Sequence, residues 1–216
     1  MHTLSKRYYP FSRHLREVFG CKVHKITIDA GFTCPNRDGT LGFGGCIYCN
    51  NRGFNSNDSQ VDVKTQIQQG ISFARRKYKA KKFIAYFQAY TNTYASPEYL
   101  NRIFREALSQ EGIVGLSIGT RPDCVEEPIL DIIEDLAKES YIWVEYGLQS
   151  AHDKTLDLIN RGHHLAHFLD AVERTKRRNI RMCVHIILGY QVKGGRRCLK
   201  QPESFPGQGW MGLKFT

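Results

Sequence analysis

Stretches rich in β-branched and aromatic residues alternate with amphipathic, charge-bearing stretches along most of this chain. The expected strands cover residues 25–29, 83–88, 113–118, 141–148 and 181–188. One helix is expected over residues 61–78. A second begins at Ser96-Pro97, a third begins near Pro128, and one or two more lie between residues 153 and 179. This order is typical of repeated βα units, which form a parallel sheet covered by helices. The pattern therefore predicts an α/β fold whose ligand lies at the carboxyl ends of the strands.

The composition favours a globular protein outside the membrane. Hydrophobic residues make up 41% and charged residues 24% of the 216 residues. No run approaches the roughly 18 apolar residues of a membrane-spanning helix, and residues 1–16 are aromatic and basic without the apolar segment of a signal peptide. We therefore expect a cytoplasmic protein with no membrane partner.

The formal net charge of +10 favours an anionic partner. Residues 190–216 contribute five Lys or Arg against one Glu, so +4 of this charge, and the other 189 residues carry +6. Phosphate contacts with a nucleic acid would use such an excess, but a solvated cationic surface explains it equally well. The basic run 75–82 falls at the amino ends of the strands, where a solvated surface is the simpler interpretation.

The loop after the first expected strand is the most unusual segment of the chain. It covers residues 30–59, whereas loops of about 2–6 residues are usual in α/β units. It contains Cys34, Cys46 and Cys49 in the pattern Cys-x11-Cys-x2-Cys, with several glycines between the first two thiols. Seven cysteines in a chain without a secretion signal indicate reduced thiols for metal or redox chemistry.

Two metal sites are compatible with this spacing. A [4Fe-4S] cluster held by three cysteines leaves one iron free for an external ligand. A structural zinc site needs a fourth protein ligand, which Cys21 or a histidine would supply. The position of the loop, at the carboxyl end of a strand in a βα series, favours the cluster.

Five segments in order along the chain resemble the YhcC/YtqA-like branch of the radical S-adenosylmethionine (SAM) superfamily. They are KITIDAGFTCPNRDGTLGFGGCIYCN, AYFQAYTNTYA, IVGLSIGTRPDC, VEYGLQSAHDKTLDLINRGH and HIILG. The resemblance covers nearly all of residues 1–189. It implies a partial (β/α)6 TIM-like barrel, and a [4Fe-4S] cluster that cleaves SAM reductively so that hydrogen is abstracted from a substrate. Cys34, Cys46 and Cys49 become the cluster ligands by this resemblance, and Tyr48 is expected near the adenine of SAM.

The resemblance also implies further contacts with SAM. Gln149 and Arg161 are similar to the Gln and Arg with which related members hold the ribose and the carboxylate of SAM. A Gly-Gly-Glu segment after strand two, usual in the superfamily, is replaced here by Phe-Gln-Ala-Tyr. Gln88, or backbone carbonyl groups near it, would then meet the SAM amino group.

The branch is associated with wobble-uridine modification, so transfer RNA is the expected substrate class. An electron donor such as flavodoxin or ferredoxin is the expected partner. Other interpretations remain: the same radical chemistry on a protein or metabolite, a zinc-stabilised nucleic-acid-binding module, or an inactive truncated fragment.

The pattern changes after Gly189. Residues 190–216 have neither a helical nor an alternating period, and the sixth-strand segment of the family is absent. We therefore divide the chain into a core domain, residues 1–189, and an atypical tail, residues 190–216, which we expect to be disordered after a truncation or a frame shift. The last strand of the barrel is expected to be missing or replaced, which would leave the fifth strand as a sheet edge.

Several other polar residues keep two interpretations. His163, His164 and His167 are spaced for metal binding, but solvated or helix-capping roles fit as well. His185 either serves a substrate or is a satisfied core residue. Glu145 and Asp123 are expected in ion pairs, and no general base is assigned.

Overall fold

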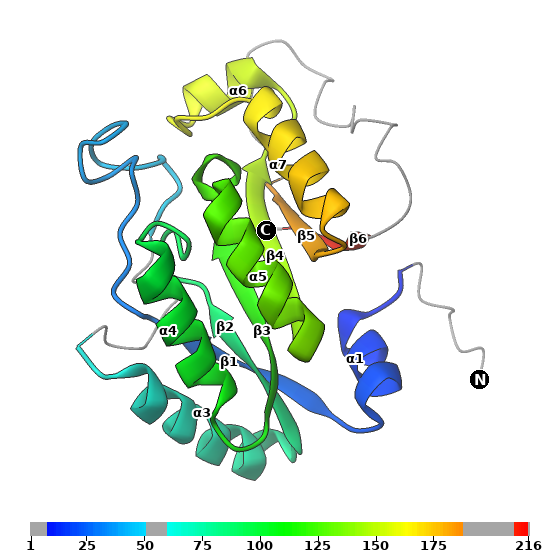
Figure 1. Cartoon of the computed structure of the whole chain (residues 1–216). Helices are drawn as coiled ribbons and strands as arrows, with labels where there is room; N and C mark the ends of the chain where they lie inside the picture. Colours follow the sequence, from blue (N-terminus) through cyan, green and yellow to red (C-terminus); the bar gives the residue numbers. More distant parts are fainter. Residues whose placement is uncertain (1–7, 51–59, 188–209, 216) are drawn as a thin grey trace.

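The computed structural model describes residues 8–50 and 60–187, together with the backbone of residues 210–215. The elements in chain order are α1 (Phe11–Phe19), β1 (Val23–Ile28), α3 (Val63–Tyr78), β2 (Lys82–Phe87), α4 (Pro97–Leu108), β3 (Ile113–Thr120), η1 (Pro122–Cys124), α5 (Glu127–Glu139), β4 (Tyr141–Gln149), α6 (Asp153–Leu158), α7 (Leu165–Arg177), β5 (Arg181–Ile186) and β6 (Trp210–Phe215). Strands and helices alternate from β1 to β5, so the predicted βα rhythm is confirmed (Figure 1).

All six strands belong to one parallel sheet with the order β1-β2-β3-β4-β5-β6. Consecutive strands are neighbours, which is the arrangement of a (β/α) barrel. In the described part of the chain β1 and β6 are the two edges of the sheet, so the barrel is partial, as predicted. Helices α3, α4, α5 and α7 cover its outer face, and α1 lies by the amino ends of the strands (Figure 1).

The sixth strand decides between the two expectations for the last strand of the barrel. We expected it to be missing or replaced, and Trp210–Phe215 pairs in parallel with β5, from Met182↔Trp210 to Ile186↔Phe215. The unpaired backbone groups along the edge of β5 are a ready partner for such a segment. The last strand is thus supplied from within the expected tail, and residues 188–209 and 216 lie outside the described residues.

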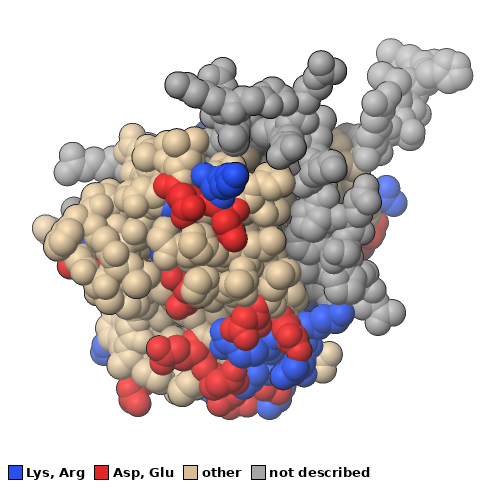
Figure 2. All heavy atoms as spheres, turned by 90° about the horizontal axis from the view of Figure 1, so that it is seen from above, with Lys and Arg blue, Asp and Glu red and all other residues tan. Residues whose placement is uncertain are grey.

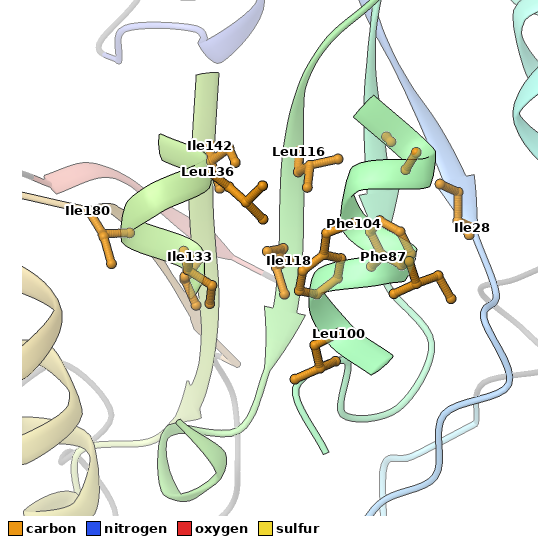
Figure 3. Close-up of a cluster of buried hydrophobic side chains, with 14 of the residues drawn as sticks. Ile28, Phe87, Leu100, Phe104, Leu116, Ile118, Ile133, Leu136, Ile142 and Ile180 are labelled. Atoms are coloured by element: carbon orange, nitrogen blue, oxygen red, sulfur yellow. The ribbon is translucent and has the colours of Figure 1, made fainter. Parts of the chain in front are cut away.

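The hydrophobic core lies between the sheet and its outer helices (Figure 3). Strand residues alternate between the two faces, so Leu116 and Ile118 of β3 point towards the helices. Phe87 of β2 and Phe104 of α4 pack edge to face with ring centroids 5.1 Å apart, and neither is exposed to solvent. Each such buried side chain contributes roughly 1.5–3 kcal/mol relative to exposure.

Helix α4 begins as its sequence predicts. Ser96 is the N-cap, its Oγ accepts a hydrogen bond from the backbone N–H of Tyr99 at 3.3 Å, and Pro97 occupies the first turn. We expect Ser96→Ala to lower the free energy of unfolding by about 1 kcal/mol, because one amide of the first turn loses its partner. Urea denaturation measures this, with Ser96→Asp as the control that keeps an acceptor. Equal losses in the two variants would contradict the capping role.

Charged side chains occur in mixed groups on the side that carries the carboxyl ends of the strands. Figure 2 looks down on this side, where Lys and Arg lie beside Asp and Glu. Along α5 and α7, Arg178 forms an ion pair with Asp131 at 2.8 Å, and Arg174 does so with Asp170 at 2.7 Å. Among the described residues, no helix is both long enough and apolar enough to cross a membrane.

Candidate functional site

The cysteine loop leaves the carboxyl end of β1 and folds into two tight turns. The carbonyl of Cys34 accepts hydrogen bonds from the amides of Arg37 and Asp38, at 2.8 and 3.2 Å. The carbonyl of Cys46 accepts one from the amide of Cys49 at 2.9 Å, so these two cysteines stand on one turn. Cys34 and Cys46 are buried, and Cys49 is half-buried.

Hydrogen bonds from one backbone amide and two asparagine side chains hold this loop against the end of α6. The amide of Ile47 donates to the carbonyl of Ile159 at 3.1 Å, and Asn160 Nδ2 donates to the carbonyl of Gly45 at 2.9 Å. Asn36 Nδ2 donates to the carbonyl of Asn160 at 2.6 Å. Segments more than a hundred residues apart therefore fix the position of the cysteine turn.

Two N–H groups approach the sulfur of Cys46. Arg161 Nη1 lies 3.5 Å and Asn36 Nδ2 lies 3.6 Å from Cys46 Sγ. Asn36 and Arg161 are 1% and 6% exposed, so both donors act where water is scarce. Charged and amide donors of this kind stabilise a sulfur that carries negative charge, as a metal-bound thiolate does.

The other two thiols act electrostatically on the thiol of Cys49. Burial raises the pKa of Cys49, and the nearby thiols of Cys46 and Cys34 raise it further, whereas Arg37 lowers it. A metal that binds Cys49 would have to displace its proton. Within residues 8–50 and 60–187, no three His, Cys, Asp or Glu side chains are arranged to hold a single metal ion.

A network of buried arginines joins the loop after β3 to the loop after α6. Arg121 donates through Nε and Nη2 to the two carboxylate oxygens of Asp123, at 2.9 and 2.7 Å. Its Nη1 donates to the carbonyl of Arg161 at 2.8 Å. Arg161 in turn donates through Nη2 and Nε to the carbonyl of Gly147, at 2.6 and 3.2 Å. Of these two buried guanidinium groups only Arg121 pairs with a carboxylate, so the positive charge of Arg161 lies beside Cys46.

Gln149 and Arg161 come together over Gly147 at the end of β4. A Cβ atom on Gly147 would lie 2.8 Å from both Arg161 Nη2 and Gln149 Nε2, so a larger residue there would displace the ends of these two side chains. The register with β5 shifts between Gly147 and Gln149, and Gln149 has a φ of 70°. A left-handed conformation at a residue other than glycine costs free energy and is frequent at functional sites.

The other two residues expected to bind SAM lie in neighbouring loops. Tyr48 is half-buried in the turn between Cys46 and Cys49, and its carbonyl accepts a hydrogen bond from the amide of Asn50 at 3.0 Å. Gln88 follows β2, where its amide donates to the carbonyl of Ile28 at 3.5 Å. The structure thus brings Arg161 to Cys46 and to Gln149, and puts Tyr48 and Gln88 in loops at the same end of the sheet.

Two buried acceptors after β2 were not assigned a role from the sequence. Thr91 Oγ1 and Asn92 Oδ1 are buried without a hydrogen-bond partner in the described part of the chain. The amide group of Asn92 is held in place because its Nδ2 donates to the carbonyl of Gly119 at 2.7 Å. Unpartnered buried acceptors are rare in native proteins, so these atoms fit a ligand that donates hydrogen bonds.

The three histidines after α6 do not form a metal site. His167 Nδ1 accepts a hydrogen bond from the amide of His164 at 3.2 Å at the start of α7, which confirms the capping interpretation for this pair. His163 instead is 3% exposed, and its Nε2 lies 3.3 Å from the carbonyl of Gly147. Burial, and then the charge of Arg161, lower the pKa of His163 to about 3. The solvated interpretation is therefore wrong for His163, because α7 folds back over β4.

Comparisons with known proteins identify the family of this chain. The Radical SAM superfamily profile matches residues 34–193. Protein YhcC of Escherichia coli K12 is 41% identical over 213 residues, which are 98% of this chain and 68% of the relative. Uncharacterized protein YtqA of Bacillus subtilis is 44% identical over 187 residues, which are 85% of this chain and 58% of the relative. The match with YhcC continues beyond Gly189, where we expected the resemblance to end.

A solved structure supports the fold. The archaeal Methanocaldococcus infernus Elp3 superposes with a TM-score of 0.55 at 19% identity, over 76% of this chain and 38% of that one. At this identity the likeness concerns the fold alone. Together, the profile match and the relatives show that this chain belongs to the radical SAM superfamily, in its YhcC/YtqA-like branch.

Proposed function

We propose that this chain is a radical SAM enzyme in which Cys34, Cys46 and Cys49 hold a [4Fe-4S] cluster that cleaves SAM. The observation that carries the proposal is the pair of buried donors, Asn36 and Arg161, beside Cys46 Sγ. A buried thiol needs no such donors, whereas a metal-bound thiolate gains from them. Each thiolate of such a cluster binds a different iron, so three cysteines leave one iron for SAM.

The residues present fit SAM as well as the cluster. The unpartnered acceptors Thr91 Oγ1 and Asn92 Oδ1 suit an ammonium group, and Gln88 lies a few residues before them. Arg161 uses three of its five N–H donors in the contacts described above and retains two for a carboxylate. Gln149 and Tyr48 would hold the ribose and the adenine.

The chemistry that the cluster and SAM supply when bound is one-electron cleavage of SAM into methionine and a 5′-deoxyadenosyl radical. The chain's own contribution is to bind and orient SAM and to exclude water. Arg161 and Arg121 provide the buried positive charge that offsets the anionic site. The electron would come from a flavodoxin or a ferredoxin in the cytoplasm.

Anaerobic reconstitution followed by incubation with SAM and dithionite tests the enzyme proposal. We expect about four irons and four sulfides per chain and the formation of 5′-deoxyadenosine. One tightly held zinc would favour the nucleic-acid-binding module instead. A cluster without 5′-deoxyadenosine would favour the inactive fragment.

Arg161→Ala should weaken SAM binding without loss of the cluster. Removal of a charge-assisted hydrogen bond costs roughly 1–3 kcal/mol, or about 5- to 150-fold in affinity. Calorimetric titration of the cluster-loaded variant with SAM measures this, and Arg105→Ala, which removes a surface cation of α4, is the control. Unchanged SAM affinity would exclude Arg161 from the SAM site.

We further propose a transfer RNA substrate modified at the wobble uridine. The support is the YhcC/YtqA-like branch and the net charge of +10. The basic run 75–82 is not part of this proposal, because it joins α3 to β2 at the end of the sheet opposite the cysteine loop.

Transcribed tRNAs with an unmodified wobble uridine, incubated with the loaded enzyme and SAM, should show a mass change confined to that nucleotide. An unchanged mass, with SAM cleavage intact, would point to a protein or a small metabolite.

A further inference from the structure

Five strands place polar side chains around one carboxylate inside the partial barrel. Glu145 of β4 is 3% exposed, yet it accepts five hydrogen bonds. The donors are Lys25 Nζ at 2.5 Å, Ser117 Oγ at 2.6 Å and Trp143 Nε1 at 2.9 Å to Oε1, and His185 Nε2 at 2.6 Å and Tyr86 OH at 3.1 Å to Oε2. A carboxylate has about four lone pairs, so this group is saturated with donors.

The carboxylate of Glu145 is ionised inside this shell. Burial alone would raise its pKa, but the hydrogen bond from His185 and the charge of Lys25 outweigh burial and hold the pKa well below its usual range. An ionised carboxylate only accepts hydrogen bonds, so the proton between it and His185 belongs to Nε2 of the imidazole. A neutral His185 therefore has its lone pair on Nδ1.

The two basic side chains, His185 and Lys25, are the accessible part of this group of residues around Glu145. The side chains of His185 and Lys25 are 17% and 25% exposed, whereas that of Glu145 is 3% exposed. The described hydrogen bonds of His185 involve Nε2 alone. A ligand that reaches this group of residues would contact the imidazole and the ammonium group more readily than the carboxylate.

His185 lies beside the candidate SAM site. It is the register partner of Gly147, over which Arg161 and Gln149 meet. Neighbouring strands are about 4.8 Å apart, so the backbone of His185 lies one strand spacing from that of Gly147. Gly119, on the adjacent strand β3, also contributes no side chain to the interior. Among the described residues, no hydrogen bond involves His185 Nδ1, which leaves this nitrogen available to a ligand.

We propose that His185 is a catalytic acid–base residue for the substrate, with Glu145 as its positioning residue. The inference rests on the proposed radical SAM function and adds a proton transfer to it. His185 Nδ1 takes the proton of a weakly acidic N–H or O–H group, and the bonding electron pair stays on the substrate heteroatom. Glu145 balances the charge of the imidazolium, and Lys25 stabilises the substrate anion. The substrate class is thus one that presents such a group into the barrel.

The first test concerns the imidazole itself and needs no substrate. Nitrogen-15 NMR of histidine-labelled chain, before and after cluster loading, should find His185 as the Nε2–H tautomer at high pH. Other ionisable groups face it inside the barrel, namely Lys25, Tyr86, Cys183 and Glu145. We therefore compare the spectrum with that of Glu145→Gln, which should lose the tautomer preference. An Nδ1–H tautomer, or a spectrum that Glu145→Gln leaves unchanged, overturns the inference.

The second test separates proton transfer from radical formation. With the unmodified tRNA transcripts as the probe, we expect His185→Gln to form 5′-deoxyadenosine without tRNA at the wild-type rate, but to yield at least a hundredfold less tRNA product. Gln keeps an N–H donor for Glu145, so the variant should fold. His24→Gln, which replaces a histidine that stacks on Tyr78 of α3, is the control and should stay within a few-fold of wild type.

The outcomes distinguish the two proposals. Wild-type product formation by His185→Gln, with an unchanged pH profile, overturns the inference and leaves the radical SAM function intact. Absence of 5′-deoxyadenosine from the wild-type enzyme overturns the proposed function. If tRNA is not the substrate, the NMR measurement decides the inference alone.

Discussion

Cys46→Ala should abolish the [4Fe-4S] cluster. We expect the iron content to fall from about four per chain to that of an unreconstituted sample, and 5′-deoxyadenosine formation to disappear, because one iron loses its protein ligand. The chain itself should still fold. Asn36 retains its hydrogen bond to the carbonyl of Asn160, and Ile47 retains its own to Ile159, so the loop stays attached to α6 without the sulfur.

Iron and sulfide analysis, with electron paramagnetic resonance of the reduced protein, measures this loss. Cys183→Ala is the matched control, because Cys183 lies on β5, away from the cysteine loop. It should retain a full cluster. Four irons and SAM cleavage in Cys46→Ala would refute the ligand assignment, and the same loss in both variants would indicate general instability.

The strands and the cysteine loop were predictable because their signals are local. Alternation of β-branched residues located β1 to β5 to within a few residues, and Ser96-Pro97 marked the start of α4. Spacing alone singled out the three cysteines. The reason is physical: turn, strand and cap preferences depend on neighbours in the sequence.

The contacts that make the site specific were not predictable in this way. Asn36 reaches Asn160, and Lys25 reaches Glu145, across 124 and 120 residues of sequence. Nothing in the segment Cys-Pro-Asn reveals that the asparagine is buried against a sulfur. The burial of His163 likewise follows from how α7 packs, and β6 depends on an open edge of β5. Such features appear only when distant segments meet.

Arg121→Ala should be among the most destabilising single substitutions near the site. Arg121 is 2% exposed and makes both charge-assisted bonds to Asp123, whose side chain is 10% exposed. Its loss leaves a buried carboxylate without a counter-charge and the carbonyl of Arg161 without a donor. Removal of one partner of a buried pair typically costs about 3–5 kcal/mol. Urea denaturation of the cluster-free chain measures the change in the free energy of unfolding.

Two further measurements distinguish a lost ion pair from a simple cavity. Replacement of both partners, Arg121→Leu with Asp123→Leu, should cost less than Arg121→Ala alone, because no unpaired charge remains.

The pH dependence of the free energy of unfolding also distinguishes an ion pair from a cavity. Burial would raise the pKa of Asp123, but the hydrogen bonds and charge of Arg121 outweigh it and lower that pKa. A carboxyl with a lowered pKa stabilises the fold above its unfolded pKa of about 3.9 and loses that contribution as the pH falls. The difference between wild type and Arg121→Ala should therefore shrink below about pH 4. A difference that is constant with pH, and a double variant no better than the single one, would show that the guanidinium acts by filling space.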